Sequence, residues 1–97
     1  MSIQEEDKNK IIRLISALQP DVKIYLFGSQ ATGKSSRGSD VDIALDGGKR
    51  MDRVDVGEIR DVLNETNILY KFDVVDFHGV PENMQKMILS EGILWKS

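Results

Sequence analysis

Apolar residues recur at helical spacing in three parts of this chain, and these stripes predict three helices. The first helix is expected from the N-cap Ser2 to Pro20, which ends it. The second follows the capping residue Asp55, and the third begins at Pro81 and stops at Gly92. The apolar stripes comprise Ile11, Leu14, Ile15 and Leu18, then Ile59, Val62, Leu63 and Thr66, then Met84, Met87 and Ile88.

Runs of apolar and β-branched residues predict three strands, at about 22–28, 40–46 and 72–77. The order helix, strand, strand, helix, strand, helix predicts an α/β (α+β) fold, in which helices pack on one face of a small mixed β-sheet. A chain of 97 residues is expected to form a single domain over residues 1–97.

A glycine-serine turn separates the first two predicted strands. Gly28 allows the backbone to approach a ligand closely, so the turn formed with Ser29 can present N–H groups to a phosphate. Asp40 and Asp42 stand two apart on the next strand, which places both carboxylates on one face, about 7 Å apart. Paired oxygen ligands suit Mg²⁺ that also binds substrate phosphates. The pattern predicts a nucleotide site; the alternative is an exposed strand edge with solvated carboxylates.

The third predicted strand offers a further carboxylate. Asp73 and Asp76 are three residues apart, so they point to opposite faces of the strand. Only one of them can point toward Asp40 and Asp42. Alternation alone leaves the choice open.

A second motif overlaps the first. Residues 28–35 read G-S-Q-A-T-G-K-S, which matches the P-loop pattern with Lys34 and Ser35 in the expected places. A P-loop needs a long helix that begins at this Lys-Ser pair. The residues that follow lack apolar periodicity and a new strand is expected almost at once, so the P-loop is the weaker interpretation.

The spacing of the turn and the D-x-D strand resembles the minimal nucleotidyltransferases, the smallest branch of the DNA polymerase beta-like nucleotidyltransferase superfamily. Their pattern is G-S-x-A-R-G followed by S-D-x-D and an apolar residue. Thr32 stands where the family usually has arginine, and Lys34 or Arg37 could supply that charge. The resemblance extends over nearly the whole chain. The matching residues are Gly28, Ser29, Ala31, Gly33, Ser39, Asp40, Asp42 and Ile43.

The resemblance implies transfer of AMP from ATP to a hydroxyl group by two-metal phosphoryl transfer. It implies that Asp40, Asp42 and Asp73 are the catalytic residues and hold Mg²⁺, two ions being expected. Asp73 is preferred because the family places its third carboxylate first in the D-x-x-D run. The expected nucleotide-binding residues are Gly28, Ser29, Lys34 and Arg37.

The resemblance also implies a partner. Minimal nucleotidyltransferases are commonly paired with a helical HEPN protein, a ribonuclease toxin, and the antitoxin can adenylylate a toxin tyrosine. Two alternatives stay open. The domain could neutralise its partner by masking alone, with Thr32 marking weakened catalysis, or it could transfer a nucleotide to a small molecule held by a separate subunit.

Composition narrows the function classes further. A net charge of −3 and a pI near 5.1 argue against a general nucleic-acid binder. The absence of cysteine excludes a disulfide framework, a zinc-thiolate site and a thiol nucleophile. No apolar run resembles a signal peptide or a membrane span, so a cytoplasmic protein is expected.

Two sets of side chains have open interpretations. Basic residues gather in sequence near the predicted site, and they either contact phosphates or form a solvated loop face. These are Lys34, Arg37, Lys49, Arg50 and Arg53. His78 follows the third predicted strand and is expected to be an ordinary loop histidine.

Overall fold

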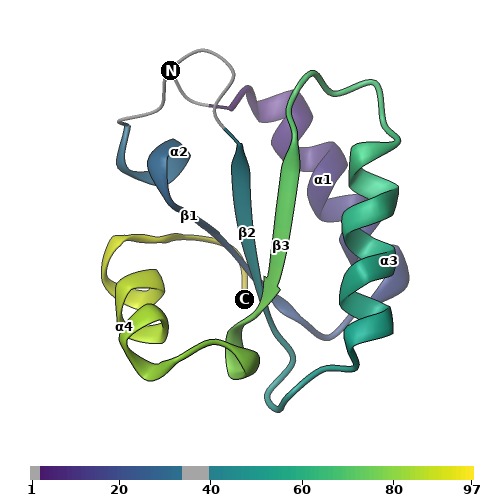
Figure 1. The fold of residues 1–97 in the computed structure, drawn as a ribbon. Helices are drawn as coiled ribbons and strands as arrows, with labels where there is room; N and C mark the ends of the chain where they lie inside the picture. Colours follow the sequence, from purple (N-terminus) through teal and green to yellow (C-terminus); the bar gives the residue numbers. More distant parts are fainter. Residues whose placement is uncertain (1–2, 34–39) are drawn as a thin grey trace.

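The computed structural model describes residues 3–33 and 40–97. Four strands, four helices and a short 3₁₀ turn are formed within these ranges (Figure 1). The helices are α1 (Glu5–Leu18), α2 (Ser29–Thr32), α3 (Arg53–Asn64) and α4 (Glu82–Glu91), with the 3₁₀ turn η1 at Phe77–Gly79. The strands are β1 (Lys23–Phe27), β2 (Val41–Asp46), β3 (Phe72–Asp76) and β4 (Ile93–Lys96).

The strands form one mixed sheet in the order β3-β2-β1-β4. β1 pairs antiparallel with both β2 and β4, whereas β2 and β3 are parallel and α3 connects them. The register sets Asp42 opposite Phe27 on one side and opposite Asp73 on the other. The expected α/β fold with a small mixed sheet is confirmed.

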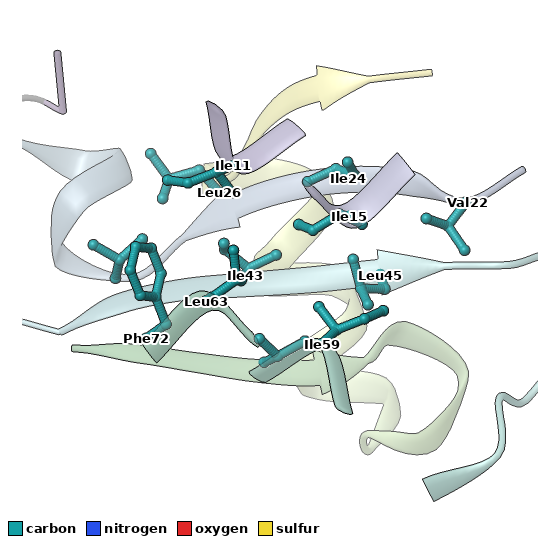
Figure 2. Close-up of a cluster of buried hydrophobic side chains, with 12 residues drawn as sticks. Ile11, Ile15, Val22, Ile24, Leu26, Ile43, Leu45, Ile59, Leu63 and Phe72 are labelled. Carbon is teal, nitrogen blue, oxygen red and sulfur yellow. The ribbon is translucent and has the colours of Figure 1, made fainter. Parts of the chain in front are cut away.

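The larger part of the core lies between the sheet and the helices α1 and α3. Ile11 and Ile15 of α1 and Ile59 and Leu63 of α3 are fully buried there, as Figure 2 shows. The strand side chains that face them alternate along each strand, which is the period-two pattern of a sheet. They are Ile24, Leu26, Val41, Ile43, Leu45, Phe72 and Val74.

Helix α4 packs on the opposite face of the sheet. Its Ile88 is fully buried in a second cluster with Phe27, Ala44 and Phe77. The expectation that all helices cover one face therefore needs a correction: α1 and α3 share one face, and α4 covers the other. The sequence pattern could not place α4, because an apolar stripe does not state which face of the sheet it will contact.

The helices begin at positions slightly different from those expected. The N-cap of α1 is Gln4, and the expected cap Ser2 lies outside the described residues. Asp52 caps α3, because its Oδ1 accepts a hydrogen bond from the Val54 N–H at 2.9 Å, so the helix begins before Asp55.

A fourth strand follows α4 at once, and the sequence pattern did not predict it. A Cβ on Gly92 would collide with the Ile88 carbonyl oxygen and would lie 3.1 Å from the Leu26 oxygen, so glycine permits this abrupt turn. The Lys96 Nζ then donates to the carbonyl oxygens of Pro20 and Val22, at 2.8 and 3.1 Å. These bonds fasten β4 beside the start of β1.

None of the helices in the described ranges combines the length and apolar character needed to cross a membrane.

Candidate functional site

The turn after β1 brings the backbone against a carboxylate. Gly28 has a φ of 76°, and a Cβ at this position would collide with Oδ2 of Asp42. Asp42 lies opposite Phe27 in the sheet, which is the residue before this turn. Only glycine therefore allows the Gly28 backbone and the Asp42 carboxylate to lie in contact.

Asp40, Asp42 and Asp73 lie together at one end of the sheet. Asp73 is the direct neighbour of Asp42 on the parallel strand β3, and Asp40 lies two residues before Asp42. Burial raises the pKa of Asp42 above its ordinary value of 3.8, and the negative charges of Asp73 and Asp40 raise it further. Asp42 is half-buried and the other two aspartates are exposed. The three expected carboxylates thus form an electrostatically coupled group.

This group fits a divalent cation that is shared with a substrate. Among residues 3–33 and 40–97, no three His, Cys, Asp or Glu side chains are arranged to hold a metal ion by themselves. Mg²⁺ is usually bound by one or two carboxylates together with substrate phosphates, so a closed cage is not required. Burial is the largest cause of the raised pKa of Asp42, and the negative charges of Asp73 and Asp40 add to it, so a cation beside these carboxylates would stabilise the ionised form.

Asp76 is engaged elsewhere. Its Oδ2 accepts a hydrogen bond from the Met51 N–H at 2.8 Å, and its Oδ1 accepts one from the His78 N–H at 3.1 Å. These bonds hold the end of β3 and the segment before α3 together. Of the two aspartates left open by alternation, Asp73 is the one beside Asp42.

Ser29 is the first residue of α2, directly after Gly28. The Gly28 carbonyl oxygen accepts from the N–H groups of Ala31 and Thr32, at 3.1 and 3.2 Å. The Thr32 hydroxyl also turns back, 3.4 Å from the carbonyl oxygens of Gly28 and Ser29. Among the described residues, the Thr32 hydroxyl thus contacts only the backbone of its own turn.

Two of the expected phosphate-binding residues, Lys34 and Arg37, lie outside the described residues, as does Ser39 of the S-D-x-D motif. The P-loop alternative is excluded by the arrangement of the strands. Helix α2 ends at Thr32 and β2 already begins at Val41, antiparallel to β1, and this spacing is too short for the long helix that a P-loop requires.

Arg50 and Arg53 were expected near the predicted site and lie elsewhere. Both line a groove with Val75 and Asp76, at the opposite end of β3 from Asp73. The expectation that these two arginines surround the site is wrong. The reason is the length of β2, which carries the chain away from Asp42 before α3 begins.

His78 makes a contact that sequence reasoning missed. Its Nε2 lies 2.6 Å from Oδ1 of Asp46, a residue 32 positions earlier. Burial raises the pKa of Asp46, but hydrogen bonds from Gly48 N–H and His78, with the charges of His78 and Lys23, lower it below its ordinary value overall. No local signal links two residues so far apart in the sequence.

Comparison with known proteins agrees with this geometry. A family model described as "Polymerase beta, Nucleotidyltransferase" matches residues 9–97. Protein adenylyltransferase MntA of Shewanella oneidensis is 30% identical over 91 residues, which cover 93% of this chain and 65% of that protein. A probable protein adenylyltransferase MntA of Haemophilus influenzae is 23% identical over 88 residues, covering 91% of this chain and 77% of that protein.

Solved structures show the same fold. A toxin–antitoxin crystal structure with AMP-PNP matches with a TM-score of 0.80 and 29% identity, over 91% of this chain and 71% of the matched chain. A complex of a tri-AMPylated HEPN toxin with an MNT antitoxin from Shewanella oneidensis matches with a TM-score of 0.77 and 26% identity, over 96% and 71%. The glycine-serine turn, the coupled aspartates and these matches show that the chain belongs to the polymerase beta nucleotidyltransferase family.

Proposed function

We propose that this protein transfers AMP from ATP to a hydroxyl group of a helical HEPN-family partner and acts as the antitoxin of that pair. The observation that carries the proposal is the coupled group of Asp40, Asp42 and Asp73 beside the Gly28 turn. The similarity to MntA adenylyltransferases and to an MNT antitoxin bound to an AMPylated toxin supports the same activity.

In this proposal the three aspartates hold Mg²⁺. When bound, Mg²⁺ would neutralise the triphosphate and lower the pKa of the attacking hydroxyl group. In this proposal Gly28 and Ser29 approach the phosphates, and the position of their turn directly against Asp42 supports this assignment. We assign Lys34 and Arg37 to the same phosphates, since both follow the turn closely in sequence.

The reaction breaks a phosphoanhydride bond of ATP and forms a phosphoester bond to the acceptor. The acceptor oxygen forms a bond to the α-phosphorus of ATP, the bond from that phosphorus to the α,β-bridging oxygen breaks, and pyrophosphate leaves with the bonding electrons. Asp73 takes the proton of the acceptor, because it is exposed and lies beside Asp42. We propose tyrosine as the acceptor, since its hydroxyl is more acidic than that of serine or threonine.

A second candidate function is neutralisation by masking alone. The observation that favours it is Thr32, an uncharged side chain whose hydroxyl lies 3.4 Å from the carbonyl oxygens of Gly28 and Ser29, so this position brings no positive charge to the turn. In that case the carboxylates would be dispensable for antitoxin function.

The two candidates are separated by co-expression with a HEPN-family partner, followed by intact mass measurement of the partner. Adenylylation adds about 329 Da for each AMP, the mass gained when phosphoryl transfer delivers this group. Asp42→Asn should abolish that gain with little change of side-chain volume. A partner that stays unmodified, and that the Asp42→Asn variant still neutralises, would favour masking.

A further inference from the structure

A groove of about 600 Å³ runs along β3 from Val74 to Asp76. We call it the β3 groove. Its walls are α3, the residues just before α3, β3 itself, and the end of η1 with the residue that follows it. The guanidinium-bearing residues Arg50, Arg53 and Arg60 line it together with Val56, Val75 and Val80. The groove thus combines positive charge with apolar surface.

The concentration of arginine is unusual for this chain. Three of its five arginines line the β3 groove, although the net charge is −3. The only ion pair that these three make among the described residues is from Arg60 Nε to Asp61, at 3.9 Å and on the surface. Such exposed pairs contribute little. The groove's own carboxylate, Asp76, accepts hydrogen bonds from two backbone N–H groups. The arginines are therefore available to an anionic ligand.

β3 is an edge strand, and its outward-facing backbone groups can be identified. The side-chain amide of Asn64 pairs with Phe72, donating to its carbonyl oxygen at 3.1 Å and accepting from its N–H at 2.8 Å. The Lys71 carbonyl oxygen instead accepts from the Val41 N–H of the neighbouring strand at 2.8 Å. The backbone N–H and C=O groups of successive residues point to alternate sides along a strand. Those of Val74 therefore point away from β2, as those of Phe72 do.

Val74 consequently offers an N–H and a carbonyl group toward the β3 groove. Its side chain belongs to the main core cluster, and the residue is only 4% exposed. Among the described residues, the Asn64 side chain hydrogen-bonds the backbone N–H and C=O of Phe72, but no side chain does so for Val74. A nearly buried backbone donor and acceptor without a partner are costly, and a ligand with complementary groups would satisfy both.

We infer that the β3 groove binds an extended acidic segment of a partner protein, which adds to the edge of β3 as a further strand. The segment's backbone pairs with Val74, and its carboxylate side chains bind the arginines, which recognise carboxylates with two parallel hydrogen bonds. Arg53, Gly57 and Arg60 lie on one face of α3, so Gly57 leaves space between the two charges. This inference does not depend on nucleotidyl transfer.

Fluorescence anisotropy tests the inference with two labelled eight-residue peptides, one alternating valine with glutamate and the other valine with lysine. The glutamate peptide should bind saturably and the lysine peptide should not. Arg53→Gln and Arg60→Gln should each weaken binding at least about fivefold, as expected for a lost charge-assisted hydrogen bond. Arg13→Gln is the matched control, because Arg13 is exposed on α1 and does not line the groove.

Gly57 gives a second pair of variants. Gly57→Glu places a carboxylate among the arginines and should compete with the peptide, so binding should be lost. Gly57→Ala should retain binding, because the nearest atom to its Cβ is Arg60 Nη2 at an ordinary 3.7 Å. Hydrogen exchange should also slow at the Val74 amide when the glutamate peptide is bound.

Several results would overturn the inference. These are equal binding of the lysine peptide, equal weakening by Arg13→Gln, and unchanged exchange at Val74 on saturation. An eight-residue oligouridine that binds in the groove when the glutamate peptide does not would assign this surface to RNA instead. The Asp42→Asn variant should bind the glutamate peptide as the parent protein does, which separates this site from the nucleotide site.

Discussion

At the scale of single residues, the contact between Gly28 and Asp42 sets the geometry of the candidate site. Gly28→Ala introduces a side chain at a φ of 76° and into the space of the Asp42 carboxylate, which must then move. We expect transfer activity to fall about 100-fold, since displacements of about 1 Å at a reacting centre have effects of this size. Intact mass of the modified partner over time measures it.

Gly33→Ala is the control for backbone strain alone. Gly33 has a φ of 73°, but no atom lies within 4 Å of a Cβ built there. Both variants should lose about 1–2 kcal/mol of unfolding free energy from the left-handed backbone, measured by urea denaturation. Only Gly28→Ala should show the roughly 100-fold loss of transfer activity expected above. Equal activity in the two variants would show that the position of Asp42 is not critical.

The charge of Asp42 has an effect on stability that needs no substrate. Burial and the charges of Asp73 and Asp40 raise the pKa of Asp42 in the folded protein above the ordinary value of 3.8. Ionised Asp42 therefore lowers the stability of the fold, and this loss develops as pH rises from 3.8 through the folded-state pKa. Asp42→Asn should therefore raise the melting temperature at pH 7, by on the order of 2 °C. The difference should shrink as pH falls toward 3.8.

Asp21→Asn is the control for this measurement, because Asp21 is exposed and lies outside the coupled group. Thermal unfolding followed by circular dichroism at several pH values provides the data. A melting temperature at pH 7 that is lower for Asp42→Asn than for the parent protein would contradict the unfavourable ionisation of Asp42 by burial and by the two neighbouring carboxylates.

The residue scale also shows what alternation can predict. Spacing along one strand placed Asp40 on the same strand as Asp42, whereas β2 begins at Val41, so Asp40 precedes the strand, although its charge still raises the pKa of Asp42. Alternation also left Asp73 and Asp76 as alternatives. The structure distinguishes these two because strand register sets Asp73 beside Asp42, whereas Asp76 bonds to Met51 and His78. Register depends on which strands pair, and that information is absent from the pattern of one strand.

At the scale of elements, the apolar stripes identified the helices α1, α3 and α4 but did not fix the residues at which these helices begin. Asp52 caps α3 in place of Asp55, since both residues are good caps and only the backbone conformation distinguishes them. The sequence pattern did not predict β4, because this strand is short, follows α4 directly and has two exposed apolar residues, Ile93 and Leu94. Its pairing with β1 stabilises it, and such pairing is a tertiary property.

The basic residues illustrate a related limit. Arg50 and Arg53 follow the D-x-D motif by about ten residues, and proximity in sequence suggested proximity in space. β2 is extended, so it carries these residues to the opposite end of the sheet from Asp42. Their position beside β3 is what forms the β3 groove, with Arg60 brought alongside by two turns of α3.

At the scale of the whole molecule, negative charge opposes nucleotide binding. The chain carries a net charge of −3, and three aspartates occupy the end of the sheet where the triphosphate is proposed to bind. Two arginines of the β3 groove, Arg50 and Arg53, lie beside the far end of β3 from Asp73 and do not compensate this charge directly. A divalent cation is the group that would reconcile the carboxylates with a polyphosphate.

We therefore expect ATP binding to depend on a divalent cation. Isothermal titration calorimetry should show binding in Mg²⁺ that weakens at least tenfold in EDTA, because each unrelieved charge pair near the surface contributes on the order of 1 kcal/mol or more. Asp42→Asn should reduce binding in Mg²⁺ toward the EDTA level, whereas Asp61→Asn, which removes an exposed charge on α3, should not. Binding of equal strength with and without EDTA would mean that the turn holds the phosphates without metal, and the assignment of the three aspartates as ligands would then fail.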